Sequence, residues 1–386
     1  MKKKVDFKSF INRPSLMAQL QSMGFTANSD KIAEEIMQEF DSKMKQIAKE
    51  VKNRNRIKAN DATKKSQPAK EVLTNEEIER LPGWVRSQIN ESMLVGKSGD
   101  VVQVPDGRKF HRKNKLNDLP GGQWTYFLNS VVNTRFPTNG KEAFAHHIRK
   151  IHPSPKPPQL MREIIEFFTK ENELVFDYFM GVGGSLLGAS LVNRRALGID
   201  LNPAYLAAYK KASQELGLNE QTVLLGDSIE LLKDSKEIEN FLRGEKFSLI
   251  LIDPPYGDML AREKTGEAIK KNKDSSPTPF TDLTTDLGNM SIDQFFPIFR
   301  DSILDAMSYL KPKGHIAIFM KDLQPTKKNP NLLHARVIED LAAIDGLNYL
   351  GMKIWADQGV NLYPYGYPFA FVSNQIHQYI MFFRMD

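Results

Sequence analysis

Phe247-Ser248-Leu249-Ile250-Leu251-Ile252 runs without a break into Asp253-Pro254-Pro255-Tyr256. The apolar run predicts a buried strand. The next four residues form a stiff strand end, because the prolines restrict the backbone between a carboxylate and an aromatic ring. The carboxylate can accept hydrogen bonds from an NH₂ group, and the ring can stack on a flat base. The stretch therefore predicts a site for a planar amino group at the end of a buried strand.

A second apolar run begins at Leu174 and breaks into glycines at Gly181, Gly183 and Gly184. Glycine lets the backbone turn sharply and approach a ligand that a side chain would push away. A helical pattern follows from Leu186, so the loop lies at a strand end, where open α/β sheets bind ligands. The spacing differs from the G-x-G-x-x-G dinucleotide fingerprint, which makes a nicotinamide cofactor the weaker interpretation.

An acidic residue follows this glycine loop at a sequence separation typical of ribose-binding sites. Ala196-Leu197-Gly198-Ile199 predicts a further strand, and Asp200 ends it. An acid about 20 residues after a glycine loop is positioned to accept hydrogen bonds from ribose hydroxyls. We therefore expect a ligand that carries a ribose.

Together these segments resemble the amino-group DNA methyltransferases, which use S-adenosylmethionine to methylate N6 of adenine or N4 of cytosine. The stretch from His152 to Pro157, followed by an apolar helix around residues 160–165, resembles the segment of that family that contacts the methionine part of the cofactor. The resemblance covers residues 145–256 well and the rest of the chain loosely. In the family arrangement with this motif order, a target-recognition domain usually follows at the C-terminus. Here the fold is expected to run to the last residues, so recognition must come from elsewhere.

The resemblance assigns roles to individual residues. It implies that the catalytic motif comprises Asp253, Pro254, Pro255 and Tyr256, and the implied mechanism requires no metal. It implies cofactor contacts from Lys156, Pro157, Asp177, Phe179, Gly181, Gly183, Asp200, Asn202 and Asp227. Tyr178 stands where the family usually has Pro, and Gly184 where it usually has a small polar residue. Neither change removes a needed donor or acceptor.

The expected fold class is α/β. The resemblance implies a seven-stranded, doubly wound Rossmann-like methyltransferase sheet over residues 146–386, with an N-terminal helical and mixed accessory region. No helix-length pattern separates the last two strands, so they should form a terminal antiparallel pair. The candidate strands are 173–179, 196–200, 221–226, 247–252, 315–320, 350–355 and 376–383.

The composition excludes several classes of protein. No stretch of the 386 residues approaches the about 20 apolar residues of a membrane span, so we expect no membrane partner. Met1-Lys2-Lys3-Lys4 is basic, but no apolar core follows as in a secretion signal, so a cytoplasmic protein is expected. The chain has no cysteine, which excludes disulfides and thiolate metal sites. It also excludes methylation of carbon 5 of cytosine, which requires a cysteine nucleophile.

The basic residues gather at the N-terminus. Residues 1–70 hold 16 Lys and Arg against 8 Asp and Glu, a balance of +8, whereas the whole chain is +6 and the other 316 residues are therefore −2. Helix-like apolar spacing within this segment predicts a basic helical arm and linker. The arm could bind phosphates, form a helix-mediated homodimer, or be solvated without a ligand.

Three further segments have open interpretations. Residues 71–145 are expected to form a mixed accessory region that contacts DNA, with a hairpin across Pro105-Asp106-Gly107. Residues 257–289 form a long insertion directly after the catalytic motif, which suggests a lid, a recognition element or disorder. The aromatic stretch from Tyr363 to Phe369 either lines the target-base pocket or is a packed crossover.

The sequence therefore predicts a site-specific methyltransferase of double-stranded DNA that acts most readily on N6 of adenine, by flipping the base into the pocket of Asp253 and Tyr256. N4 of cytosine and the N2 amino group of guanine in RNA are the alternative targets. A non-catalytic nucleic-acid-binding protein is the more distant alternative function. A cognate restriction or defence partner is left open.

Overall fold

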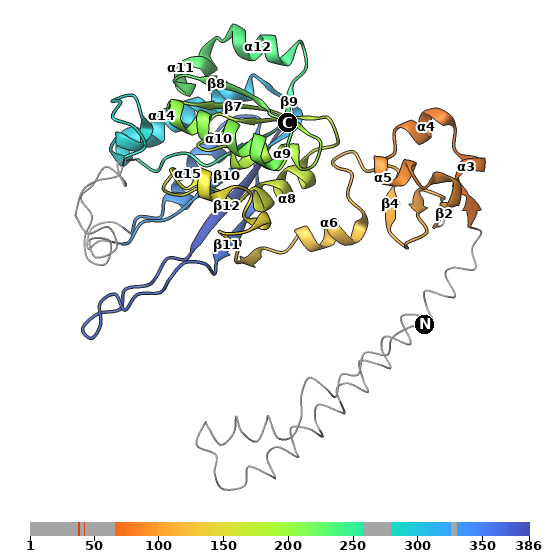
Figure 1. Ribbon diagram of the computed structural model, residues 1–386, viewed down its shortest axis with the longest axis horizontal. Helices are drawn as coiled ribbons and strands as arrows, with labels where there is room; N and C mark the ends of the chain where they lie inside the picture. Colours follow the sequence, from red (N-terminus) through yellow and green to blue (C-terminus); the bar gives the residue numbers. More distant parts are fainter. Residues whose placement is uncertain (1–37, 39–41, 43–65, 97, 258–278, 326–329) are drawn as a thin grey trace.

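The computed structural model describes residues 38, 42, 66–96, 98–257, 279–325 and 330–386. Its main body is an eight-stranded mixed sheet in the order β5-β11-β12-β10-β9-β6-β7-β8, with helices on both faces (Figure 1). Strand β12 is antiparallel to β10 and β11, and the other neighbours pair in parallel. The strands are β5 (Val131–Thr134), β6 (Leu174–Asp177), β7 (Arg195–Asp200), β8 (Thr222–Leu225), β9 (Phe247–Ile252), β10 (Leu310–Met320), β11 (Leu347–Asp357) and β12 (His377–Met385).

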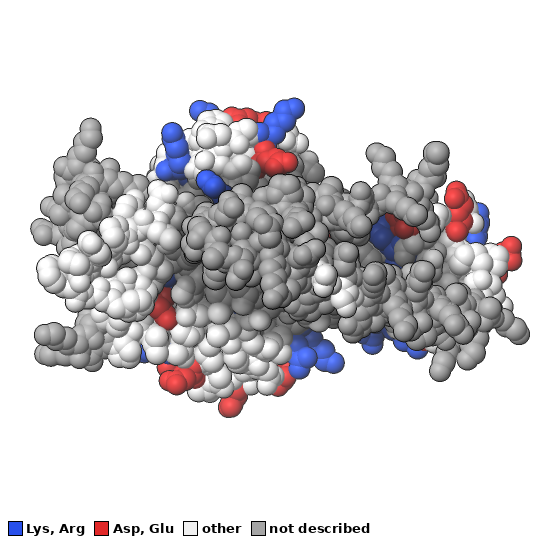
Figure 2. Space-filling view, turned by 90° about the horizontal axis from the view of Figure 1, so that it is seen from below, with Lys and Arg blue, Asp and Glu red and all other residues white. Residues whose placement is uncertain are grey.

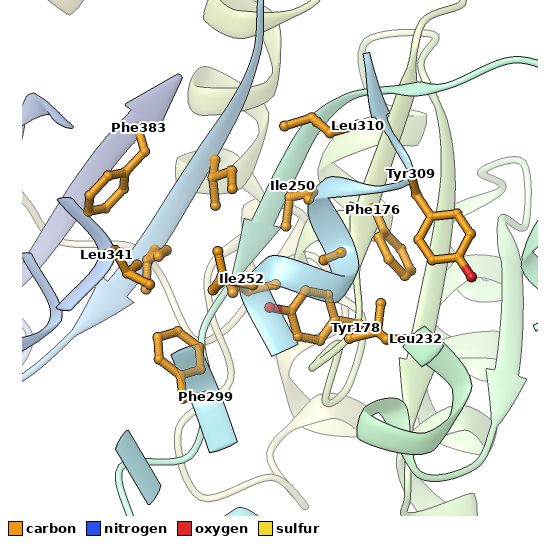
Figure 3. Packing of buried hydrophobic residues seen from close by; sticks show 14 of the residues in the cluster. Phe176, Tyr178, Leu232, Ile250, Ile252, Phe299, Tyr309, Leu310, Leu341 and Phe383 are labelled. Carbon is orange, nitrogen blue, oxygen red and sulfur yellow. The ribbon is translucent and has the colours of Figure 1, made fainter. Parts of the chain in front are cut away.

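Strand β9 shows why the sheet is covered on both faces. Its six residues are all buried, and alternate side chains face opposite layers of the core. Ile250 and Ile252 pack with Phe176 in one layer, which Figure 3 shows from close by. Leu249 and Leu251 pack in the other layer. A strand buried on both faces reads as a continuous apolar run, which is the pattern that the sequence shows here.

Helices from successive crossovers form the two layers. The layer that contains Leu249 is built by α8 (Pro158–Phe168), α9 (Gly184–Ser190) and α10 (Pro203–Leu216). The layer in Figure 3 is built by α11 (Ser228–Lys233), α12 (Lys236–Leu242), α14 (Ile292–Met307) and α15 (Leu333–Ala342). Capping side chains mark where several helices begin. Ser291, for example, accepts from the Gln294 amide in a capping box at the start of α14.

The prediction of the sheet is confirmed except for its strand count. Each of the seven expected strands is present, and β11 and β12 form the predicted antiparallel pair. The count of seven is wrong because β5 adds an eighth strand at the edge, parallel to β11. Because β5 lies in the methyltransferase sheet, residues 71–145 do not form one accessory unit. Helices α6 (Gly121–Phe127) and α7 (His146–Arg149) flank β5 in the chain.

A small second sheet lies beside the main body (Figure 1). It has the order β1-β2-β3-β4 and its own apolar core, which includes Val85, Val102 and Phe110. The predicted hairpin is confirmed, since β3 and β4 pair antiparallel on either side of the Pro105-Asp106-Gly107 turn. The unit comprises β1 (Gln67–Pro68), α3 (Ala69–Val72), α4 (Asn75–Glu79), α5 (Gly83–Arg86), β2 (Met93–Val95), β3 (Val101–Gln103) and β4 (Lys109–His111).

The connection between β11 and β12 projects from the body as a long hairpin (Figure 1). Its tip is exposed, with 81% of Tyr367 and 94% of both Phe369 and Phe371 accessible to solvent. The expectation of a packed crossover is therefore wrong for the tip. At the base of the hairpin, Tyr363 lines a cavity that is described below.

Acidic and basic side chains of the described residues are interspersed on the face shown in Figure 2. The basic helical arm predicted for residues 1–70 lies almost entirely outside the described residues, as does most of the insertion predicted at 257–289. Within the described parts of the chain, no helix has both the length and the apolarity needed to cross a bilayer.

Candidate active site

A pocket of about 280 Å³ lies at the carboxyl ends of β6, β7, β9 and β10. Its wall brings together the segment after His152, the glycine loop, Asp200 at the end of β7, and the catalytic tetrapeptide after β9. Parallel strands gather these segments at one edge of the sheet, which is where open α/β folds bind their ligands. The segments recognised separately in the sequence therefore form one site.

The glycine loop is held from behind by Asp177. The Asp177 carboxylate accepts hydrogen bonds from the Phe179 amide at 3.1 Å and from the Ser185 hydroxyl. Burial raises the pKa of Asp177 to about 7. Gly183 turns the chain with φ at +72°, and a Cβ at this position would overlap the ring of Tyr209. Only glycine fits this turn without displacing the helix behind it.

Asp200 links the end of β7 to the glycine loop. Its Oδ2 accepts from the amide of Gly181 at 2.8 Å, and its Oδ1 accepts from the amide of Asn202 at 2.8 Å. Burial raises the pKa of Asp200 to about 6. Each carboxylate oxygen keeps a further lone pair, so the group can still accept hydrogen bonds from the two hydroxyls of a ribose.

An aromatic wall closes the pocket around His152. Its ring stacks on Phe280, with 5.1 Å between centroids, and meets the edge of Tyr205 at 4.9 Å. Burial lowers the pKa of His152 to about 4, so the ring is neutral at pH 7, and its Nδ1 accepts from the amide of Ser154 at 3.1 Å. A Cβ on Gly181 would lie 3.2 Å from this ring, so the loop backbone and the histidine are in close contact.

The tetrapeptide predicted to be catalytic, Asp253 to Tyr256, is fixed by two donors. The Lys156 ammonium forms an ion pair with Oδ2 of Asp253, and the Tyr256 hydroxyl donates to Oδ1 at 2.7 Å. Both the lysine and the tyrosine are buried, and burial raises the pKa of the Tyr256 hydroxyl. The Asp253 side chain is 17% exposed and faces the pocket, so its remaining lone pairs are accessible to a ligand. The arrangement holds a carboxylate acceptor in a single orientation.

Most of the predicted site residues line this pocket: Lys156, Phe179, Gly181, Asp200, Asp227, Asp253, Pro254, Pro255 and Tyr256. The others lie behind its wall and support it: Pro157, Asp177, Gly183 and Asn202. Asn202 begins α10 by accepting from the Ala204 amide at 2.9 Å, and its side-chain amide donates to the Phe280 carbonyl at 3.0 Å. Asp227 begins α11 by accepting from the amide of Ile229 at 2.9 Å.

The lining residues that were not identified from the sequence include Tyr205, Phe280, Lys321 and Gln378. Phe280 lies in the insertion and Tyr205 in a helix, and no local pattern marks either one as facing a ligand. Lys321 could have been predicted from the sequence, because it directly follows the apolar run of β10 and so lies at the carboxyl edge of the sheet. Gln378 lies on an antiparallel strand whose beginning reaches the same edge.

The topology and this edge site define a Rossmann-like methyltransferase. The model of the DNA methylase family N6_N4_Mtase matches residues 6–211, which is more than half of the chain. The chain belongs to this family, and its cofactor is S-adenosylmethionine. The matched range ends before Asp253, so the tetrapeptide lies outside it.

Curated relatives include tRNA methyltransferases and type II methyltransferases. The chain is 32% identical over 155 residues to a tRNA (guanine(10)-N2)-dimethyltransferase of Methanocaldococcus jannaschii, a match that covers 38% of this chain and 41% of the relative. It is 33% identical over 81 residues to the type II methyltransferase M1.MboII of Moraxella bovis, covering 21% and 29%. The chain therefore spans about half or less of the length of these relatives.

Among solved structures, TrmN from Thermus thermophilus is similar with a TM-score of 0.36 and 16% identity, over 59% of this chain and 48% of that one.

The pocket fits the cofactor on its own geometry. Gly181 and Asp200 both line the pocket, and Asp200 offers acceptors for ribose hydroxyls. The apolar side chains of Leu201 and Ile229 line the pocket next to Asp227, where a flat ring system can lie. These residues would hold the nucleoside part, with the segment around Lys156 on the side of Asp253.

Proposed function

We propose that this protein transfers a methyl group from S-adenosylmethionine to the exocyclic amino group of a base in DNA, with N6 of adenine as the target. The observation that carries the proposal is the Asp253 carboxylate, which Lys156 and Tyr256 hold in one orientation beside the cofactor loop. DNA follows from the description of the family, and adenine from the aspartate that opens the tetrapeptide. N4 of cytosine is the alternative target on the same polymer.

The target base has to leave the duplex to reach this pocket. Asp253 lies at the sheet edge inside a concave site, and a base stacked in a helix cannot present its amino group there. Extrusion of the base costs a few kcal/mol, which stacking and hydrogen bonds in the pocket offset. The ring of Tyr256 lines the pocket beside Asp253 and offers the stacking surface.

The chemistry follows from the acceptors that the chain supplies. Asp253 and the Pro254 carbonyl accept hydrogen bonds from the amino group, which draws its lone pair out of conjugation with the ring. When bound, the cofactor supplies an electrophilic methyl group on a sulfonium. The amino nitrogen forms a bond to the methyl carbon as the carbon–sulfur bond breaks, and the nitrogen then loses a proton to Asp253 or water. Orientation accounts for most of the acceleration, and Asp253 does not have to be a strong base.

RNA is the second candidate substrate. The relatives with the longer matches are named tRNA (guanine(10)-N2)-dimethyltransferases, and the amino group of guanine can occupy the same pair of acceptors. The sequence pI of about 9.1 favours a nucleic acid over a small molecule and fits either polymer.

The test is methyl transfer from tritiated S-adenosylmethionine to genomic DNA and to total tRNA, with products digested to nucleosides and separated. Label in N6-methyladenine that is lost with Asp253→Asn supports the proposal, and label in N4-methylcytosine changes only the base. Label confined to N2-methylguanine of tRNA replaces DNA with RNA. Label at a position other than an exocyclic amino group contradicts the role given to Asp253.

A further inference from the structure

A second cavity of about 440 Å³ adjoins the pocket at the same edge of the sheet. It lies over the ends of β5 and β11 and the base of the long hairpin, and it shares Pro153, Ser154, Lys156, Lys321 and Gln378 with the first pocket. Its volume is within the range of about 300–1,000 Å³ that is common for ligand sites. Nothing in the chemistry proposed above uses this cavity.

Lys321 stands between the two cavities. It directly follows β10, which lies in the sheet between the strand that leads to Asp253 and the strand that carries Gln378. Its ammonium is partly buried and makes no hydrogen bond or ion pair with any residue in the described ranges. Burial is the main cause that lowers the pKa of Lys321, the nearby Lys156 ammonium adds to the lowering, and the Asp357 carboxylate opposes it.

The other charged groups of this wall already have partners. The Lys156 ammonium is paired with Asp253. The guanidinium of Arg149 donates to the carbonyls of Phe144 and Lys156 at 3.0 and 2.9 Å. Asp357, the acid of the second cavity, accepts from the amide of Gly359 at 2.8 Å. The Asp357 carboxylate attracts the Lys321 ammonium but forms no ion pair with it, so the position of Lys321 suits a ligand that brings a negative charge into direct contact.

The order of the strands indicates what this ligand is. The cofactor residues Gly181 and Asp200 follow β6 and β7, on one side of Asp253, and the second cavity lies over β12 and β11, on the other side. A nucleotide chain whose target base lies at Asp253 would continue across β10 into that cavity. Phe136, which is half-buried, offers it an aromatic ring there, and this ring packs against the buried Trp355 with 6.4 Å between centroids.

We propose that the second cavity binds the nucleotide next to the target base and that the Lys321 ammonium binds the phosphate between the two. This inference rests on the proposed action on a nucleic acid and names a binding site for that substrate. It assigns to Lys321 a contact with the polymer, and none with the cofactor.

The test compares Lys321→Met and Lys321→Arg with Lys313→Met, which removes an exposed lysine from the opposite end of the same strand. Binding of fluorescein-labelled duplex DNA and of tRNA is followed by anisotropy across a salt series. Steady-state kinetics with the polymer that is methylated give KM and kcat. Calorimetry with S-adenosylhomocysteine gives the cofactor affinity. Loss of one phosphate contact should weaken binding of the polymer on the order of tenfold and reduce the slope of log K against log salt by about 1.

The expected pattern for Lys321→Met is a raised KM with kcat and cofactor affinity unchanged. Lys321→Arg should restore most of the affinity, and Lys313→Met should behave as the wild type. Wild-type polymer affinity and salt slope in Lys321→Met overturn the proposal, and so does a loss confined to S-adenosylhomocysteine, which would place the ammonium on the cofactor carboxylate. If the wild type transfers no methyl group to either polymer, the proposed function fails, while the anisotropy series still decides the role of Lys321.

Discussion

The Lys156 ammonium and the Asp253 carboxylate form an ion pair that joins two segments 97 positions apart in the sequence. One residue belongs to the segment that precedes α8, and the other opens the catalytic tetrapeptide. Only 6% of the lysine side chain is exposed, so the pair is mostly out of water. The Asp253 carboxylate is thereby oriented by the segment that the resemblance assigns to the cofactor.

Removal of the Asp253 carboxylate should cost both stability and activity. Asp253→Ala leaves the buried Lys156 ammonium without its anion, and breaking a pair of this kind destabilises by about 3 kcal/mol. Asp253→Asn keeps an oxygen that can accept from Lys156, so it should lose much less stability. Both variants should lose methyl transfer by at least about a hundredfold. Urea denaturation and the tritium assay measure the two effects, and an active Asp253→Asn enzyme would remove the carboxylate from the mechanism.

The turn at Gly183 should tolerate no side chain. Gly183→Ala places a methyl group against the ring of Tyr209 in a left-handed conformation, so we expect a loss of about 3 kcal/mol in the free energy of unfolding. Gly217→Ala is the matched control, because Gly217 has φ at +62° and open space around an added Cβ. The control should cost about 1 kcal/mol, from backbone conformation alone. Equal losses in the two variants would show that the contact with Tyr209 contributes nothing.

Local patterns predicted the sheet and the catalytic edge because both depend on short continuous segments. A six-residue apolar run such as β9 fits few structures other than a buried strand. The residue that follows a parallel strand must then lie at the carboxyl edge of the sheet. Asp200 and Asp253 were found in this way.

Long-range contacts account for what the sequence left out. Strand β5 has four residues and acquires its place from β11, where the Lys353 ammonium donates to the carbonyl of Phe127, 226 positions away. Phe280 reaches the pocket from the far end of the insertion and is fixed there by His152 and Asn202. Neither contact has a periodicity that a window along the chain could detect.

Cofactor affinity should depend on pH through Asp200. A ribose hydroxyl donates to the ionised carboxylate, and burial sets the pKa of this group at about 6. Affinity for S-adenosylhomocysteine should therefore be constant above pH 7 and fall towards tenfold per unit below pH 6. Asp200→Asn should bind weakly and lose this fall in affinity in calorimetry, whereas the contribution of the buried Asp177 remains in both proteins. An unchanged pH profile in Asp200→Asn would assign the titration to another group.

The free energy of unfolding should follow the opposite trend with pH from that of cofactor affinity. The folded pKa of Asp200 is raised from 3.8, so the folded state holds the proton more tightly than the unfolded state between pH 4 and 6. Its contribution to stability is fully present below about pH 4 and is lost as the pH rises through about 6. The Tm of the ligand-free protein should decline over this range, and it should decline less in Asp200→Asn.

The tip of the long hairpin should contribute to binding of the nucleic acid. Residues 358–376 include no Asp, Glu, Lys or Arg, and Phe369 and Phe371 are each 94% exposed beyond the second cavity. Exposed rings on a segment without charge suit stacking on bases, which is worth about 1–3 kcal/mol for each base. Changing both phenylalanines to serine should therefore weaken polymer affinity at least tenfold and leave the Tm unchanged, because neither ring is packed. Leu304→Ser, on the surface of α14, is the control and should leave polymer affinity unchanged. If the double variant instead changes only the sedimentation coefficient, the tip is a contact between copies of the chain.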